Sequence, residues 1–245
     1  MKKIKLLGVA WSPRHGNTEL QLKAALKAAK ELPEVETEYY SIAGKDISPC
    51  ISCYACDDSY GVCNKNDPCV AHSGNGDAYH DIINLMHEAD GIIFACPVYF
   101  YSVTSQLKAF MDRSMAVEMC NEPWRNKVFG CITSAYHRNG GQEHAIETMI
   151  NWAKMFDMLT VGIGPERAGD ECANYMGVSG IQGFPLPKSN LTEEGLRAVM
   201  DDPVGVAGLK FLGWRVAELT KIIGYGIDQM QEEEWKWDAY TATRK

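Results

Sequence analysis

The sequence predicts an α/β fold built on a doubly wound, five-stranded parallel sheet, with a cysteine-rich insertion and a C-terminal extension. This prediction rests on two observations, the alternation of two apolar patterns and the composition of the segments between them. Short apolar runs, which are typical of buried parallel strands, alternate with segments whose apolar residues recur at helical spacing. Gly-, Pro- and Ser-containing connections separate them. This alternation indicates a parallel sheet with helices on both faces.

The first elements follow from these two patterns. Residues 3–9 form a short apolar run that suits a central strand. Thr18 and Gln21 fit a capping box at the start of a helix, and the apolar face of that helix extends over residues 22–29. Residues 35–41 are expected to form the second strand.

The later elements follow in the same way. Apolar runs predict the remaining strands at 91–95, 128–133 and 159–163. Helical spacing predicts helices over 79–88, 103–114, 145–156 and 205–221, of which the last closes the sheet. We therefore expect a domain over residues 1–165, with a cysteine-rich segment at 46–76, and a C-terminal extension over residues 166–245.

Composition limits the classes of function. The chain has 245 residues, of which 46% are hydrophobic and 23% charged, as in an ordinary globular protein. A formal charge of −8 argues against nucleic-acid binding, and no apolar stretch approaches the roughly 20 residues of a membrane span. Nine cysteines without a secretion signal indicate reduced thiols, so we expect a cytoplasmic protein.

Three connections should meet at one edge of the sheet, because ligands of such sheets bind beyond the carboxyl ends of the strands. They are residues 11–17, 96–102 and 134–141, which are rich in Gly, Ser, Pro and aromatic residues. The first precedes a helix and contains Arg14, so it could cradle an anion at the helix N-terminus. A turn without any ligand is the alternative for this loop taken alone.

Five of the cysteines lie within one stretch of twenty residues: Cys50, Cys53, Cys56, Cys63 and Cys69. The first three have the spacing C-x2-C-x2-C, with which the bacterial iron–sulfur ferredoxin motif begins. Zinc is the main rival, although its sites usually pair their cysteines, and thiols without a metal are a third reading. Five histidines show no metal-pair spacing, and we expect them at the surface: His72, His80, His87, His137 and His144. His15 could contact a phosphate.

The chain resembles the flavodoxin-like NAD(P)H-dependent FMN reductases over about residues 3–165. The similarity lies in three segments that occur in the family's order: Ser-Pro-Arg…Gly-Asn-Thr at 12–18, Ala-Asp-Gly-Ile-Ile-Phe-Ala-Cys-Pro-Val-Tyr at 89–99, and Gln-Leu-Lys-Ala-Phe-Met-Asp-Arg at 106–113. With the cysteine segment, the chain resembles the iron–sulfur flavoprotein branch, which carries FMN and a 4Fe–4S cluster.

The resemblance implies a set of site residues. The phosphate of FMN would be held by Ser12, Arg14, Gly16, Asn17 and Thr18. The isoalloxazine would lie against Pro97, Val98, Tyr99 and Phe100. Its edge would be covered by Ser134, Tyr136, Gly140 and Gly141. The cluster would be bound by Cys50, Cys53, Cys56 and Cys63.

The chain departs from the family pattern at a few positions. Trp11 stands where a small residue is usual, and Cys96 replaces a Ser or Gly beside the flavin. The residues that follow Cys63 look like an insertion, which makes Cys69 a rival for the fourth ligand position. We predict Cys63 because it is nearer to the triplet and matches the fourth position of the family.

The functional prediction is an FMN-dependent oxidoreductase that passes electrons between the 4Fe–4S cluster, FMN and a small-molecule acceptor. A ferredoxin-like protein or NAD(P)H would be the electron donor, and no protein group would be needed as a catalytic base. The resemblance implies a homodimer or homotetramer. The alternatives are a cluster-free NAD(P)H-dependent FMN or quinone reductase and a non-catalytic FMN-binding redox sensor.

Overall fold

A computed structural model describes residues 3–56, 69–72, 74–118, 123–164, 176–183 and 186–230. The described residues contain a six-stranded parallel sheet with strands in the order β2-β1-β3-β4-β5, and β6 also pairs with β4. The strands are β1 (Ile4–Ala10), β2 (Val35–Ser41), β3 (Gly91–Pro97), β4 (Val128–Ala135), β5 (Leu159–Val161) and β6 (Val178–Ile181). The predicted fold class is confirmed.

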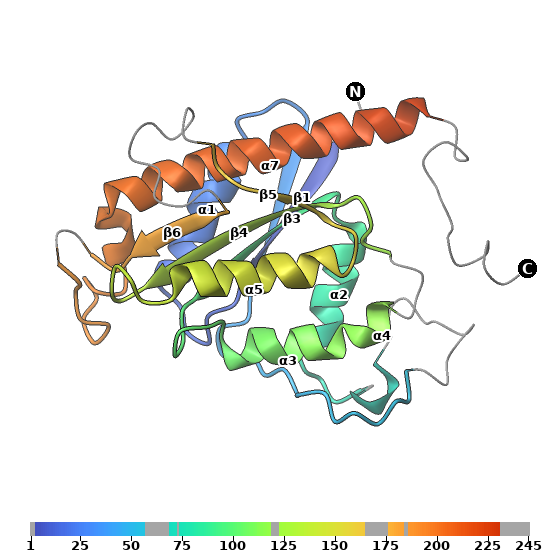
Figure 1. Cartoon of the computed structure of the whole chain (residues 1–245), viewed down its shortest axis with the longest axis horizontal. Helices are drawn as coiled ribbons and strands as arrows, with labels where there is room; N and C mark the ends of the chain where they lie inside the picture. Colours follow the sequence, from blue (N-terminus) through green and yellow to red (C-terminus); the bar gives the residue numbers. More distant parts are fainter. Residues whose placement is uncertain are drawn as a thin grey trace, which may run out of the picture.

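Helices cover both faces of the sheet (Figure 1). One face carries α1 (Asn17–Ala29) and α7 (Pro203–Gln229), which pack on it through one apolar cluster. The other carries α2 (Tyr79–Glu88), α3 (Ser105–Arg113) and α5 (Gln142–Lys154), together with most of the buried aromatic rings. Shorter helical segments are α4 (Met115–Glu118), η1 (Val70–His72) and η3 (Ala198–Asp201). No helix of the described residues is long and apolar enough to cross a membrane.

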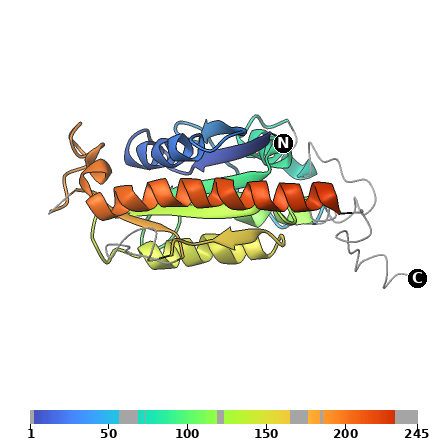
Figure 2. The same ribbon diagram turned by 90° about the horizontal axis from the view of Figure 1, so that it is seen from above.

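The helix α7 lies along the sheet and crosses α1 closely (Figure 2). Gly213 makes this approach possible, because a Cβ atom there would lie 2.1 Å from the main-chain oxygen of Ala25. The closing helix predicted at 205–221 is therefore present, and it is longer than its apolar pattern suggested.

The strand β6 was not predicted from the sequence. The strand β5 pairs with Val128–Gly130, whereas β6 pairs with Ile132–Ala135, so the two short strands share one edge of β4. Asp202, at the N-cap position of α7, accepts a hydrogen bond of 3.0 Å from the main-chain N–H of Ile181. This bond ties β6 to the start of the closing helix.

The predicted capping box at Thr18 is wrong. The helix α1 begins at Asn17, its N-cap residue is Gly16, and no side chain caps it. Gly16 has φ of 139°, which favours glycine, and a Cβ atom there would lie 3.1 Å from the main-chain oxygen of Leu196. The start of α1 is therefore set by a glycine against a neighbouring segment.

Candidate functional site

The three predicted loops meet at the point where the strand order reverses. The chain leaves β1 toward β2 on one side and reaches β3 on the other, so the carboxyl ends of β1 and β3 form the switch point of the sheet. The loop after β4 is adjacent, since the Val98 N–H donates a 2.9 Å hydrogen bond to the main-chain oxygen of Ser134.

Trp11 fixes the first loop to the β3–α3 unit. Its side chain is fully buried, with its ring centroid 5.1 Å from that of Phe94 and 4.9 Å from that of Phe110. Its main chain donates to Ala95 and accepts from the Thr104 hydroxyl at 2.9 Å. Trp11, which stands where the family usually has a small residue, is thus a core residue that positions the loop.

The first turn of α1 offers unpartnered main-chain donors. Among the residues that the structure describes, no acceptor is recorded for the N–H groups of residues 17–19. Such groups form an anion site at a helix N-terminus. Arg14 is exposed beside them, while the Ser12 hydroxyl donates a 2.7 Å bond to the main-chain oxygen of Arg14.

The side chain of Asn17, which the resemblance assigns to the FMN phosphate, makes two hydrogen bonds within the protein. The Asn17 amide donates to the main-chain oxygen of Gly195 at 2.8 Å and accepts from the N–H of Val199 at 3.1 Å. Its side chain therefore anchors the segment before η3, and Thr18 is buried. The groups of this loop that remain available to an anion are chiefly main-chain N–H groups, with Arg14 beside them.

Glu19 places a carboxylate in the same helical turn, but hydrogen bonds engage it. It accepts from the Ser41 hydroxyl at 2.6 Å and contacts Nδ1 of His15 at 2.8 Å. Burial raises the pKa of Glu19, yet hydrogen bonds from Ser41, His15 and Tyr39 outweigh this effect and lower it below the ordinary value. The carboxylate is held by these side chains.

The second and third loops are in direct contact. Gly141, at φ of 101°, lies so close to Tyr101 that a Cβ atom would meet the Tyr101 Cα at 2.8 Å and its main-chain oxygen at 2.9 Å. Phe100 and Tyr101 themselves have positive φ values of 43° and 70°, in a turn closed by two hydrogen bonds between Tyr99 and Ser102. The two loops thus form one wall.

This wall exposes aromatic rings. Tyr99, Phe100, Tyr101 and Tyr136 are all exposed at the carboxyl edge of the sheet, and Phe100 is fully so. Pro97, Val98 and Gly140 are half-buried behind them, and Ser134 is buried. Clustered exposed apolar side chains mark a ligand-binding or interaction surface, and here they would meet the face of a flat ring.

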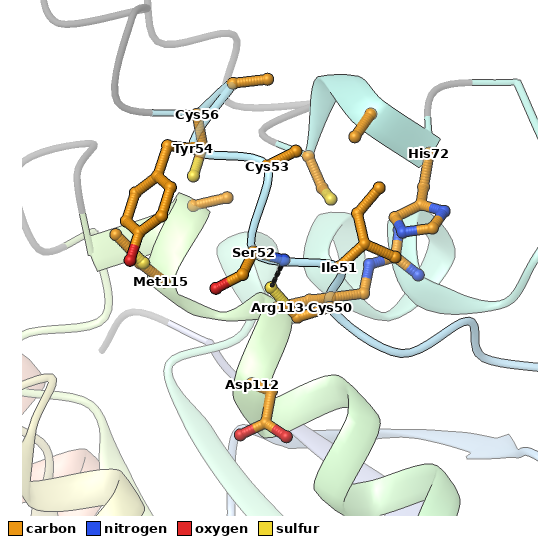
Figure 3. A pocket seen from close by; sticks show the side chains of 14 residues that line it. Cys50, Ile51, Ser52, Cys53, Tyr54, Cys56, His72, Asp112, Arg113 and Met115 are labelled. Carbon is orange, nitrogen blue, oxygen red and sulfur yellow. Dashed lines mark hydrogen bonds between the residues drawn. The ribbon is translucent and has the colours of Figure 1, made fainter.

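The cysteine loop lies at the far end of α3 from these loops. Ser52 and Tyr54 both have φ of 55°, which curls the chain between the cysteines, and the Ser52 N–H contacts Sγ of Cys50 at 3.4 Å. Cys50, Cys53, Cys56 and Cys69 line one pocket, with His72 and Arg113 on its walls (Figure 3).

Cys63 lies outside the described residues, so its assignment as the fourth ligand stays a prediction. Cys69 was expected to stand apart from the ligands, but it lines the pocket with the other three cysteines. No three Cys, His, Asp or Glu side chains of the described residues converge on a point that could hold a single metal ion.

Comparisons with known proteins decide the family. The family model described as NADPH-dependent FMN reductase matches residues 4–164. The chain belongs to this family. An iron-sulfur flavoprotein of Methanocaldococcus jannaschii is 36% identical over 90% of this chain and 99% of the relative, and one of Archaeoglobus fulgidus is 31% identical over 89% and 96%. The chain therefore belongs to the iron–sulfur flavoprotein branch of this FMN reductase family.

A solved structure supports the fold alone. RosB with a bound 8-demethyl-8-formylriboflavin-5'-phosphate intermediate superposes with a TM-score of 0.62 at 15% identity, over 91% of this chain and 81% of that one. As a member of the FMN reductase family, the chain is a flavin-dependent oxidoreductase. The sequence-based recognition of the family is confirmed.

The residues of this FMN reductase family member fit both groups that the branch implies. The free N–H groups of α1 and the exposed aromatic wall suit a phosphate and a flat ring. Two residues that line the cysteine pocket have buried nitrogen atoms without a hydrogen-bond partner among the described residues: Nε and Nη2 of Arg113 and Nε2 of His72. Buried donors are nearly always satisfied, so an anionic group in this pocket would complete them. His72, expected at the surface, is a pocket residue that its spacing could not reveal.

Proposed function

We propose that the protein is an electron-transfer flavoprotein that holds FMN at the three-loop site and a 4Fe–4S cluster at the cysteine pocket. One observation carries the proposal. The helix α3 begins directly after the aromatic loop, and its last residue, Arg113, lines the cysteine pocket. Nine residues of helix span roughly 14 Å, so one rigid element joins the two sites.

Each site has a distinct task for the protein. When bound, FMN exchanges one or two electrons and the cluster exchanges one, so the pair would link one-electron and two-electron partners. The main-chain donors of α1 and Arg14 would bind and orient the FMN phosphate. The aromatic wall would cover the ring and limit access to small acceptors. The cysteine loop would hold the cluster near the surface.

The cysteine loop also suits contact with a protein partner. Ile51 and Tyr54 are large apolar side chains that are each about 60% exposed beside the cysteines. Exposed apolar residues around a redox site favour docking. A ferredoxin-like donor would meet the cluster first, and in a homodimer or homotetramer the same loop could face the flavin of another copy. NAD(P)H would be the alternative donor.

Anaerobic purification followed by absorbance and by iron, sulfide and FMN counts tests this proposal. We expect FMN and four iron and four sulfide per chain. Stopped-flow mixing with reduced ferredoxin should then show bleaching of the cluster no later than that of the flavin. A yellow protein without iron, or one that contains zinc, would contradict the cluster.

A cluster-free NAD(P)H-dependent FMN or quinone reductase is the second candidate, because the matching family is described as NADPH-dependent. It predicts rapid reduction of the flavin by NADPH and full turnover in Cys53→Ser. Our proposal predicts that Cys53→Ser loses the ferredoxin-driven reaction and keeps direct oxidation of the flavin by a quinone.

Single serine variants decide the fourth ligand. We propose Cys63 with Cys50, Cys53 and Cys56, and expect its serine variant to lose cluster absorbance while FMN remains. Because Cys69 lines the pocket, Cys69→Ser is the matched comparison. If Cys69→Ser loses the cluster and Cys63→Ser keeps four iron per chain, Cys69 takes the position.

A further inference from the structure

Arg113 is a fully buried cation whose hydrogen-bonding capacity is only partly used. The residue is 1% exposed, at the C-terminal end of α3. Its Nη1 donates to the carboxylate of Asp77 and, at 3.3 Å, to the main-chain oxygen of Ser48. Its Nε and Nη2 are also buried and have no acceptor among the described residues.

The neighbours of Arg113 do not take up these two groups. One face of the guanidinium is covered by the Tyr79 ring, whose centroid is 3.8 Å from Cζ. Asp77 is shared with other donors, since it also accepts from the main-chain N–H groups of Ser48 at 2.9 Å and Tyr79 at 3.2 Å. A bidentate fork to one carboxylate, which is common for arginine, is therefore not formed.

The pocket is where acceptors for these N–H groups can be supplied. Arg113 lines it together with the four cysteines, below the loop that carries Cys50 and Cys53 (Figure 3). His72 also lines the pocket, and its Nε2 is a further buried nitrogen without a hydrogen-bond partner among the described residues. The two buried Arg113 donors beside a set of thiols indicate an anionic, sulfur-rich occupant.

We propose that Arg113 hydrogen-bonds through Nε and Nη2 to the sulfur atoms of the cluster, and that this contact raises the reduction potential of the cluster. The inference rests on the proposed function. Reduction adds one electron and one negative charge to an anionic cluster. A buried cation with two donors stabilises the reduced form more than the oxidised form, and hydrogen bonds to the sulfurs are among the factors that set such potentials. Arg113 then adjusts the reduction potential of the cluster. The carboxylate of Asp77 offsets part of the positive charge that Arg113 presents to the cluster.

The sign of two substitutions distinguishes this role from a structural one. Arg113→Lys keeps a cation that can pair with Asp77 and removes the fork of donors, so the potential should fall. Asp77→Asn keeps Arg113 and removes the opposing charge, so the potential should rise. A residue that only stabilises the fold would make both variants change in the same direction, or leave both potentials unchanged.

The measurement is a redox titration of the purified holoprotein, followed by electron paramagnetic resonance for the cluster and by absorbance for FMN. We expect Arg113→Lys to shift the oxidised-to-reduced ratio of the cluster by about tenfold toward the oxidised form, which is 59 mV for a one-electron couple. The FMN midpoint should stay unchanged. Lys154→Met, which removes an exposed cation that does not line the pocket, is the control.

Each outcome bears on the proposal. A lower potential in Arg113→Lys with a higher one in Asp77→Asn supports it. Equal potentials in wild type and both variants overturn it while the proposed function stands. If Arg113→Lys does not fold, the Asp77→Asn result is sufficient: a cluster potential that falls or stays unchanged in this variant overturns the proposal. Wild-type protein without iron overturns both the cluster and the role of Arg113.

Discussion

Replacement of Gly141 by alanine should separate the second loop from the third. Gly141 has φ of 101°, and a Cβ atom there would lie 2.8 Å from the Cα of Tyr101 and 2.9 Å from its main-chain oxygen. The contacted atoms are main-chain atoms in a turn closed by two hydrogen bonds between Tyr99 and Ser102. The turn must therefore move as a unit, away from the place expected for the flavin ring.

The magnitude has two parts. An alanine with a left-handed backbone costs roughly 1–2 kcal/mol relative to glycine. Overpacking against a fixed neighbour adds roughly 1–3 kcal/mol. Gly44→Ala isolates the first part, because Gly44 has φ of 71° and nothing within 4 Å of its Cβ position. The excess effect of Gly141→Ala over Gly44→Ala is then the cost of moving the loop.

The assay combines urea unfolding with titration of FMN into flavin-free protein. We expect both variants to lose stability and Gly141→Ala to lose more. Only Gly141→Ala should weaken FMN binding, by roughly tenfold, which corresponds to 1.4 kcal/mol. If the two variants bind FMN equally well, the contact between these loops does not shape the flavin site and our reasoning is refuted.

Three further predictions concern the first loop. Arg14→Ala should weaken FMN binding by about 1.5 kcal/mol, the lower end of the range for a hydrogen bond to a charged group, because Arg14 is exposed; unchanged affinity would remove it from the site. Asn17→Ala should lower the unfolding free energy by roughly 1–3 kcal/mol through the two bonds to Gly195 and Val199, and faster hydrogen exchange of the Val199 amide would verify it. The pKa of Glu19 is lowered in the fold, so its stabilising effect is present above the unfolded value of about 4.3 and lost as pH falls through the folded value. The stability difference between wild type and Glu19→Gln should accordingly shrink in acid, and a difference that is constant with pH would contradict the assignment.

The clearest predicted strand, β3, is one whose signal lies in a continuous apolar run. The run in β3 is buried from Gly91 to Cys96, so its residues are apolar throughout. The strand β6 has only four residues, including a glycine, and its pairing with β4 depends on α7 and Asp202 far along the chain. A local pattern cannot show such a strand.

The sequence predicted where the loops of the candidate site lie, but it did not predict which side chains bind one another there. The loops at the carboxyl ends of β1, β3 and β4 follow from the alternation of elements. The engagement of Asn17 by Gly195 joins residues 178 positions apart, and the pairing of Arg113 with Asp77 joins residues 36 apart. Both depend on how distant segments pack, so the sequence pointed to Asn17 as a site residue without showing its neighbours, and it did not indicate the pair of Arg113 and Asp77.

The sharing of one β4 edge by β5 and β6 has a consequence for engineering this protein. A chain cut after residue 164 would keep every residue that matches the family, yet it would strip the partner from Ile132–Ala135. Unpaired main-chain groups at a sheet edge favour pairing with another copy, and this edge leads directly into the loop that is predicted to cover the flavin. The shortened protein should therefore aggregate through β4, the strand that leads into this predicted cofactor loop, so β6 protects the edge next to which the flavin is proposed to bind.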